Sequence, residues 1–263
     1  MKSVGYWRLG DPISGLENDH TLSIVHPMNI LRHVILTALI GLLCSCQNNS
    51  SLTGSVGQLG QVTPLQLLAE CNVRPDLIAS GKYGRRYYRP MRARYITVHS
   101  TQNYTGNAYQ HALALKRGAL RATQRKGGNR IGYLTWHFTV QQDVAIQHLP
   151  CREQGEHADF DGPGNNYSIG IEMCEHKGND LSWTIDRTAR LSAYLMYTYG
   201  IPLNHVVPHY HWPRISPYIS QPHKNCPHFL MDNGRPGKKW QWFLSRVKMH
   251  YQRIIPGPVK PLG

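Results

Sequence analysis

The stretch HYHWPRISPYISQPHKNCP, residues 209–227, decides how the rest of this sequence is interpreted. It contains three histidines, a lysine and a cysteine, and it lies between two stretches with helical patterns. Neutral imidazole and thiolate are ligands that zinc prefers, and a zinc ion that holds a reactive water needs at least three protein ligands. We therefore expect His209 and Cys226 to be two ligands of a zinc site.

Two spacings in this stretch are informative if the chain is extended there, because residues two apart then point the same way. Lys224 would share a side with Cys226, and His209 would share a side with His211. A cation fixed beside a zinc ligand could neutralise the oxyanion that forms in zinc-assisted hydrolysis. The alternative from these residues alone is a solvated basic loop with a buried structural cysteine.

Length and composition indicate one catalytic domain with appendages. The chain has 263 residues, of which 41% are hydrophobic and 17% charged, which is enough for one good core. Its net charge is +14, and because acidic and basic residues balance within residues 1–46, the excess lies in residues 47–263. Such a surface attracts an anionic polymer, whether nucleic acid, acidic glycan or lipid headgroups, and charge alone does not choose among them.

The N-terminal part has the features of an export signal. Residues 28–46 read MNILRHVILTALIGLLCSC, in which two basic residues precede an apolar run too short to span a bilayer comfortably. The end of this segment, LCSC, resembles a bacterial lipobox in which Cys46 would be acylated. An ordinary signal peptide or a short core helix is the alternative. We expect Met28 to be the true initiator and residues 1–27 to be a gene-model artefact.

The residues after Cys46 predict a tether and a location. Residues 47–62 are rich in Ser, Gly, Asn and Gln, the composition of a flexible linker. Gln47 rather than aspartate follows the cysteine, which resembles outer-membrane sorting in enteric-type bacteria. We therefore expect an exported protein with a lipid anchor in the outer membrane, facing the periplasm. A folded domain of residues 63–255 and a tail of residues 256–263 would follow.

Helices are predicted from capping residues and from apolar positions at helical spacing. The first begins at Pro64 after the N-cap Thr63, and the second follows the capping pair Asn107 and Gln110 and runs towards Gly127. Two more helices are expected, and their starting signals are Thr184 and Lys239.

Three predicted strands carry candidate site residues, and the first two contain histidines. Residues 94–101, RYITVHST, alternate so that His99 lies on the face opposite the apolar side chains, near the end of the strand. Residues 135–141 form a second predicted strand, which carries Trp136 and His137.

A third strand is expected around Glu172, after a turn that Asn165 and Asn166 close. A carboxylate inside an otherwise apolar strand is costly unless it is paired or functional. Glu172 is therefore a candidate for a functional role. The alternative is a satisfied ion pair with Lys177 or an arginine.

Residues 82–94 interleave arginines with tyrosines, a composition that could bind single-stranded nucleic acid. A solvated face is the commoner reason for such a run, and the export signal argues against a nucleic-acid partner. With Cys226 assigned to a metal and two cysteines in the export signal, at most one internal disulfide can form. The cysteines that remain for it are Cys71, Cys151 and Cys174.

Five segments, taken in order, resemble the zinc-dependent N-acetylmuramoyl-L-alanine amidases. This peptidoglycan-cleaving family includes peptidoglycan recognition proteins and amidase-type phage lysins. The matching segments, within residues 95–247, are ITVHST, TWHFTVQQD, GEHADFDGPGNNYSIGIEMC, VVPHYHW, and KNCPHFL with the tryptophan-containing helix after it. The resemblance implies an α/β fold with a mixed central sheet flanked by helices and with zinc in a groove at one edge of the strands.

The resemblance also implies roles for individual residues. It makes His99, His209 and Cys226 the zinc ligands. Glu172 matches the carboxylate that activates water, and Lys224 matches the residue that stabilises the developing negative charge.

Three further residues, Trp136, His137 and His157, match positions at which the family lines its substrate groove. Some members have a tyrosine where this chain has Trp136. An indole cannot supply that hydroxyl, so the proton transfer would rest on Glu172.

The spacing of the ligands departs from the family. Residues 213–223 intervene where the family has only a few residues, which leaves His211 and His223 as competitors of His209.

The expected function is hydrolysis of the amide bond between the lactyl group of N-acetylmuramic acid and L-alanine, with peptidoglycan as the partner. The alternative is a peptidoglycan-binding protein without turnover, as among recognition proteins that have lost the cysteine ligand. Cys226, Lys224 and Glu172 are all present, which favours an enzyme.

Overall fold

The computed structural model of the protein describes residues 60–122, 131–213 and 223–263. The expected export signal, Cys46 and nearly all of the expected tether lie outside these residues, as do Gly127 and most of the 213–223 insertion. Within the described residues, no helix combines the length and the apolar character that crossing a membrane requires.

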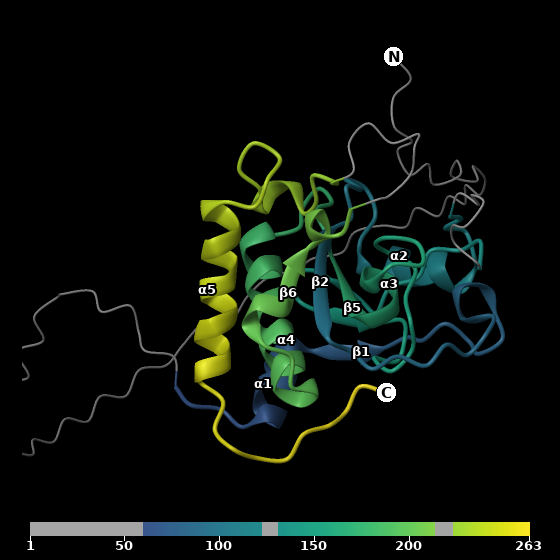
Figure 1. Ribbon diagram of the computed structural model, residues 1–263. Coiled ribbons are helices and arrows are strands. Elements are labelled where there is room, and N and C mark those ends of the chain that lie inside the picture. The colour runs from purple at the N-terminus through teal and green to yellow at the C-terminus, as the bar shows by residue number, and fades with distance from the viewer. Residues whose placement is uncertain (1–59, 123–130, 214–222) are drawn as a thin grey trace, which may run out of the picture. The chain divides into compact units, whose positions relative to one another are not determined.

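A mixed sheet of six strands lies at the centre of the described domain (Figure 1). The β3–β4 pair is antiparallel and the other pairs are parallel. In spatial order the strands are β1 (Val73–Pro75), β4 (Ala145–Gln147), β3 (Phe138–Val140), β5 (Ser168–Met173), β2 (Tyr95–Ser100) and β6 (Val206–Pro208). The predicted α/β fold with a mixed central sheet is therefore confirmed.

Helices cover both faces of this sheet (Figure 1). On one face α4 (Leu181–Tyr199) packs between the sheet and two further helices, α1 (Pro64–Cys71) and α5 (Lys238–Gln252). On the other face lie α2 (Ala108–Lys116) and α3 (Pro163–Tyr167). Short 3-10 turns complete the described elements: η1 (Tyr83–Arg85), η2 (Leu203–His205), η3 (His209–His211) and η4 (His228–Leu230).

The main core lies between the sheet and α4. Ile96 and Val98 of β2 are fully buried in it together with Leu191 and Leu195 of α4. Because side chains alternate along a strand, His99 points to the opposite face, as predicted.

The capping residues place the first two helices where the sequence predicts them. Thr63 accepts a hydrogen bond from the Gln66 backbone, and the Gln66 side chain accepts one from the Thr63 backbone. Asn107 and Gln110 make the same reciprocal pair at the start of α2. Both helices begin with a capping box, which satisfies backbone N–H groups that the first turn leaves open.

The predicted end of the second helix is wrong. α2 ends at Lys116 rather than near Gly127, and Gly118 follows in a left-handed conformation with φ 64°. A Cβ at position 118 would lie 2.2 Å from the Tyr83 ring, so the close approach of this ring and the backbone requires glycine.

The N-cap of α4 is Asp180 rather than Thr184. The Asp180 carboxylate accepts from the Trp183 backbone, whereas the Thr184 hydroxyl lies inside the helix and donates to the Asp180 carbonyl.

The turn predicted at Asn165 and Asn166 is a short helix, α3. The Asp159 carboxylate accepts hydrogen bonds from the backbone of Gly164 and Asn165, both at 2.9 Å, and so stabilises its first turn. The second predicted strand, residues 135–141, is shortened to β3.

The cysteines and the C-terminal residues are part of this domain. Cys71, Cys151 and Cys174 are buried free thiols, so none of the disulfides that the sequence allowed is formed among them. The Leu262 carbonyl accepts hydrogen bonds from Cys151 N and from the Gln147 side chain, which fixes the tail against the sheet.

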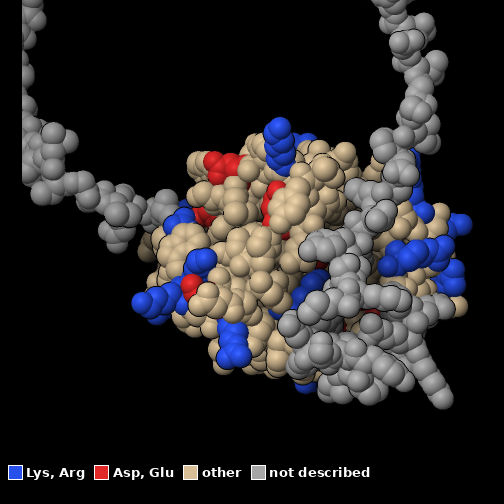
Figure 2. Space-filling model, turned by 90° about the horizontal axis from the view of Figure 1, so that it is seen from above, with Lys and Arg blue, Asp and Glu red and all other residues tan. Residues whose placement is uncertain are grey.

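The surface of the domain carries the positive charge that the composition predicts. Figure 2 shows Lys and Arg side chains at several places around the face it draws, with Asp and Glu less frequent.

Candidate metal centre

The register of two central strands brings His99 and Glu172 side by side. β2 and β5 are parallel, and His99 pairs with Glu172 across them. Paired residues of neighbouring strands point to the same face, and the distance from His99 Nδ1 to Glu172 Oε1 is 3.8 Å. Both residues lie near the carboxyl ends of their strands, where the connecting loops meet.

His209 follows β6, which pairs with the other edge of β2. Pro208 ends β6 opposite Val98, so the next residues of the two strands, His209 and His99, meet with ring centroids 4.5 Å apart. The chain turns into η3 here and is not extended as expected. The predicted shared side of His209 and His211 is therefore wrong, because His209 is buried and His211 is exposed.

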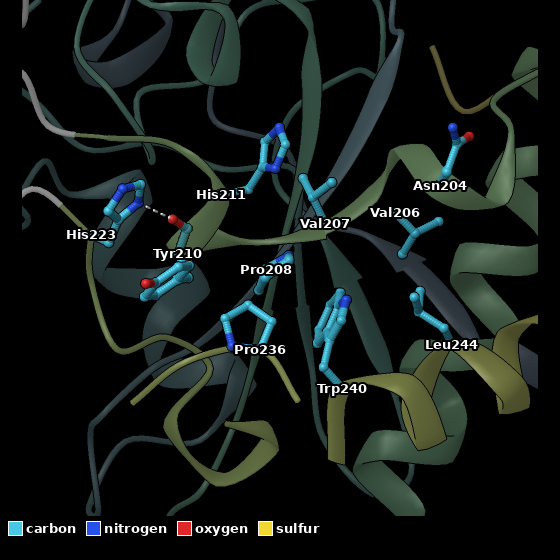
Figure 3. A pocket seen from close by; sticks show the side chains of 10 residues that line it. All are labelled: Asn204, Val206, Val207, Pro208, Tyr210, His211, His223, Pro236, Trp240 and Leu244. Atoms are coloured by element: carbon cyan, nitrogen blue, oxygen red, sulfur yellow. Dashed lines mark hydrogen bonds between the residues drawn. The ribbon is translucent and has the colours of Figure 1, made fainter. Parts of the chain in front are cut away.

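The competing histidines are not members of the His99–His209–Cys226 cluster among the described residues, and Figure 3 shows where their side chains lie. His211 and His223 line a hollow of about 450 Å³ between β6 and α5. His223 Nδ1 lies 2.7 Å from the Tyr210 carbonyl oxygen, and the two rings stack with centroids 4.7 Å apart. His209 is therefore the histidine of residues 209–227 that meets His99.

Cys226 completes the cluster. One ligand atom from each of His99, His209 and Cys226 lies within 4.8 Å of the other two, and all three side chains are buried. The Ser100 backbone N–H donates to Cys226 Sγ at 3.3 Å, and the Tyr210 N–H donates to the Cys226 carbonyl at 3.2 Å. These hydrogen bonds tie the cysteine to the segments that carry both histidines.

The chemistry of this donor set fits zinc. Burial, aided by the nearby His209 and His157 rings and by Lys224, lowers the pKa of His99 well below its usual value, so the ring is neutral. Burial raises the pKa of the Cys226 thiol to about 11 despite the opposing charge of Lys224, and a bound metal would displace the thiol proton. Imidazole nitrogen and thiolate sulfur are both zinc ligands, and catalytic zinc sites use three protein ligands and keep the fourth position open.

Glu172 is a largely buried carboxyl beside this cluster, with 15% of its side chain exposed. Burial raises its pKa to about 7, although the charge of Lys224 acts to lower it. Its Oε2 atom has no hydrogen-bond partner among the described residues, and neither Lys177 nor an arginine pairs with Glu172 in this part of the chain. The alternative of a satisfied ion pair is therefore not supported. A carboxyl with a pKa near neutrality can take up and return a proton during a reaction.

Lys224 brings a positive charge to the same place. Burial raises the pKa of both Glu172 and Cys226, and the charge of Lys224 opposes this rise. The Lys224 carbonyl accepts from Cys226 N at 2.8 Å, a γ-turn in place of the extended chain expected here. The extended chain on which the shared side of Lys224 and Cys226 depended is therefore not formed, and the role of Lys224 stays a prediction.

The residues predicted to line the groove lie in different settings. Trp136 is 6% exposed, packs with Ile78 and Leu115, and donates from its indole to Thr139 Oγ1 at 2.8 Å. The indole therefore lies in a hydrophobic cluster that contains none of the three candidate ligands.

His137 is fully buried, and backbone groups contact both of its ring nitrogens. Nδ1 accepts from Gly170 N, and Nε2 lies against the Glu153 carbonyl, both at 2.9 Å. His157, in contrast, reaches the ligand set, because its Nδ1 lies 3.0 Å from His99 Nε2. Burial lowers the pKa of His157 to about 3. A substrate-binding role for these residues stays a prediction.

One set of polar contacts near Cys226 was not expected from the sequence. His228 Nδ1 lies 3.2 Å from Ser100 Oγ, and its Nε2 lies 3.2 Å from Glu175 Oε2. Glu175 also accepts from Gln102 N at 2.5 Å. These contacts link the ends of β2 and β5 to the cysteine segment. Their residues lie far apart in the chain and form no recognisable motif.

Known proteins share this domain. CwlH, an N-acetylmuramoyl-L-alanine amidase of Bacillus subtilis (strain 168), is 35% identical over 179 residues, which are 66% of this chain and 60% of that protein. XlyA, an N-acetylmuramoyl-L-alanine amidase of the same organism, is 37% identical over 164 residues, 61% of this chain and 48% of that protein. The chain thus spans only about half of these relatives' length.

The solved structure of the catalytic domain of XlyA is similar in fold, with a TM-score of 0.53 and 35% identity. The similarity covers 67% of this chain and 99% of that domain. Residues 89–229 match the family model described as N-acetylmuramoyl-L-alanine amidase, and this range includes the three clustered residues and Glu172. The chain therefore belongs to the N-acetylmuramoyl-L-alanine amidase family.

Proposed function

We propose that this protein is a zinc-dependent amidase that cleaves the bond between the N-acetylmuramoyl lactyl group and the L-alanine of the peptidoglycan stem peptide. Family membership and the similarity to a solved catalytic domain support the reaction class. The observation that carries the proposal is the convergence of His99, His209 and Cys226, with Glu172 beside them.

The residues divide into ligands and reacting groups. His99, His209 and Cys226 would hold a zinc ion, which supplies Lewis acidity and an activated water when bound. Glu172 takes a proton from the attacking water and returns it to the leaving alanine nitrogen. Lys224 faces the negative charge that develops on the carbonyl oxygen.

Digestion of purified sacculi tests this proposal. The protein is incubated with sacculi as prepared, after treatment with a chelator, and after zinc is restored, and the released products are analysed by mass spectrometry. We expect free stem peptides that begin with L-alanine, loss of release with chelator, and recovery with zinc. Disaccharide products would indicate a glycosidase instead.

The second candidate is a protein that binds peptidoglycan without cleaving it. Retention of Cys226, Lys224 and Glu172 disfavours this candidate, because binding alone needs none of them. Zinc-loaded protein that co-sediments with sacculi and releases no peptide would support it.

We also propose that the protein is exported and held in the outer membrane, facing the periplasm, by a lipid on Cys46. The lipobox-like residues, Gln47 and the linker composition of residues 47–62 support this location. An anchored enzyme on such a tether could reach the peptidoglycan, its expected partner.

A further inference from the structure

Both histidines of the ligand set are contacted by two consecutive residues of one segment. His99 Nε2 lies 3.0 Å from His157 Nδ1. His209 Nε2 lies 3.1 Å from the Ala158 carbonyl oxygen. The same ring nitrogen of each histidine therefore contacts residues 157–158.

The partner of His209 decides which of its nitrogens carries hydrogen. A carbonyl oxygen only accepts hydrogen bonds, so His209 Nε2 must donate to Ala158. In a neutral imidazole the other nitrogen then carries no hydrogen and presents its lone pair. The atom of His209 that is left to bind a metal is Nδ1.

The hydrogen bonds of the His157 ring decide in the same way which nitrogen of His99 carries hydrogen. His157 Nε2 lies 3.4 Å from the Ser168 carbonyl oxygen, to which it can only donate. His157 Nδ1 is then an acceptor, and it receives the Nε2 hydrogen of His99. The lone pair of His99 is again on Nδ1, the atom 3.8 Å from Glu172.

The His157 ring has a fitted place in the fold. It lies against the backbone of Gly170 on β5, where a Cβ would come within 2.8 Å of three ring atoms. Any other residue at position 170 would therefore collide with the ring. His157 is 8% exposed, a poor position for a residue whose main role is to bind substrate.

One buried side chain holds the backbone of the two residues. Asn165 Oδ1 accepts hydrogen bonds from both His157 N and Ala158 N, each at 2.8 Å. Its Nδ2 donates to the Phe160 carbonyl at 2.5 Å and to Glu156 Oε2 at 3.2 Å. Because the amide is bonded at both ends, the orientation of the segment is fixed.

We propose that residues 157–158, held by Asn165, are a positioning segment that presents Nδ1 of both His99 and His209 to the metal. This inference rests on the zinc site of the proposed function and assigns His157 a role other than lining the substrate groove. Groups that fix the tautomer and orientation of metal-binding histidines commonly change metal affinity about 10- to 100-fold when they are removed.

The tautomers can be read directly in the unaltered protein. Long-range ¹H–¹⁵N spectra of labelled protein distinguish Nδ1 from Nε2, with the two rings assigned from single substitutions of His99 and His209. We expect the hydrogen on Nε2 of both rings without metal, and a shift of both Nδ1 resonances when zinc is added. A hydrogen on Nδ1 of either ring would overturn the proposal.

Substitutions test the role of the His157 ring. His157→Asn can place an amide oxygen where Nδ1 lies, whereas His157→Leu keeps bulk and removes the acceptor. We expect His157→Leu to bind zinc about 10- to 100-fold more weakly in competition with a chromogenic chelator, and His157→Asn to recover most of this loss. Folded His157→Leu protein with wild-type zinc affinity would overturn the proposal.

His148→Leu is the matched control, since it removes another fully buried ring, which lies 2.8 Å from Thr139 Oγ1 and has no contact with His99 or His157 among the described residues. Its folded fraction should bind zinc as the wild type does, and a loss equal to that of His157→Leu would contradict the proposal. If His157→Leu does not fold, the tautomer spectra of the unaltered protein still test the proposal. Correct tautomers in a protein that binds zinc and leaves sacculi intact would refute the proposed function and support the positioning role.

Discussion

At the scale of single residues, the three candidate ligands depend on segments that are far apart in the chain. His99 comes from β2, His209 from the start of η3, and Cys226 from a turn held by Ser100 and Tyr210. Because only three protein ligands would hold the metal, loss of one should remove a large share of the free energy of metal binding.

We predict that Cys226→Ser loses zinc and activity together, because a hydroxyl is a poor replacement for thiolate. Metal content of the purified variant and release of peptides from sacculi measure the two effects. Cys151→Ser is the control, since Cys151 is another fully buried free thiol outside the cluster, and it should keep its zinc. Full zinc occupancy with full turnover in Cys226→Ser would show that the cysteine is not a ligand.

We predict that Glu172→Gln keeps its zinc and lowers the turnover number about a hundredfold to ten-thousandfold, the usual contribution of a general acid or base. The amide has the shape of the carboxyl and cannot take up the proton. Sacculus binding should change little. Thermal melts with and without chelator serve as the control and should match those of the wild type. A folded, zinc-loaded variant that is nearly as fast as the wild type would show that a group other than Glu172 activates the water.

A smaller effect is expected for Lys224→Ala. If the metal carries most of the oxyanion charge, removing the ammonium should lower the turnover number about tenfold to a thousandfold, by analogy with loss of one oxyanion donor. Steady-state kinetics on a soluble muropeptide would separate this loss from a change in KM. An unchanged turnover number would exclude Lys224 from the reaction.

Some of these residues could be predicted from the sequence and others could not. His99, Glu172 and Cys226 were found because their side chains are unusual at their positions and occur in recognisable motifs. The roles of the Ala158 carbonyl and the Ser100 N–H could not be predicted from the sequence, because nearly every residue type has both groups.

At the scale of elements, predictability follows the length of the pattern. β2 and β5 have six residues each, so their alternation is visible, and the register between them places His99 beside Glu172. β1, β4 and β6 have three residues each, which is too short for a periodic signal, and the sequence does not predict them. β3 is equally short and is predicted only within the longer stretch of residues 135–141. Their positions depend on pairing with neighbouring strands, which sequence patterns do not report.

Charged side chains join the two longest helices on the outer side of the core. Asp186 of α4 is 7% exposed and accepts from Arg246 Nε of α5 at 3.1 Å. His250 Nε2 of α5 lies 3.0 Å from the same oxygen, and Arg190 pairs with Asp186 at 2.7 Å. Burial alone would raise the pKa of Asp186, but the hydrogen bonds from His250 and Arg246 outweigh it and lower the pKa below its usual value.

We predict that Asp186→Asn lowers the free energy of unfolding by about 1.5–3 kcal/mol near neutral pH, the range for hydrogen bonds to a charged group. The pKa of Asp186 is lower in the folded than in the unfolded protein. Its charge therefore stabilises the fold above the unfolded-state value of about 4, and this stabilisation is lost as the pH falls through the folded-state value. Urea denaturation between pH 3 and 7 should show the difference between variant and wild type shrinking at the acid end.

Asp180→Asn is the control for this prediction. Asp180 lies on the same helix as its N-cap, and asparagine caps about as well as aspartate, so stability should hardly change. A difference between wild type and Asp186→Asn that stays constant down to pH 3 would contradict the linkage.

At the scale of the whole molecule, the chain divides by composition as well as by structure. The family match begins at residue 89, and the described domain begins at residue 60. The residues before it hold the apolar run and the lipobox-like end. The excess of positive charge lies in the domain, so contact with an anionic polymer such as peptidoglycan should weaken as salt screens these charges.

We predict that Cys46→Ser releases the mature protein from the membrane. Acylation needs the thiol of the last lipobox cysteine, so Cys46→Ser would carry no lipid at this position. Even a single acyl chain gives only marginal membrane binding, and a protein without any should appear in the soluble fraction. Cells that express the wild type or a variant are fractionated, and the protein is followed by immunoblotting.

Cys44→Ser is the matched control: it removes a thiol two residues away, outside the acylated position, and should leave the protein in the membrane. If Cys46→Ser stays in the membrane as firmly as the wild type, Cys46 is not the anchor. If both variants are released, the residues around position 44 are needed for the signal to be processed, and metabolic labelling with a fatty acid analogue then decides whether Cys46 carries the lipid.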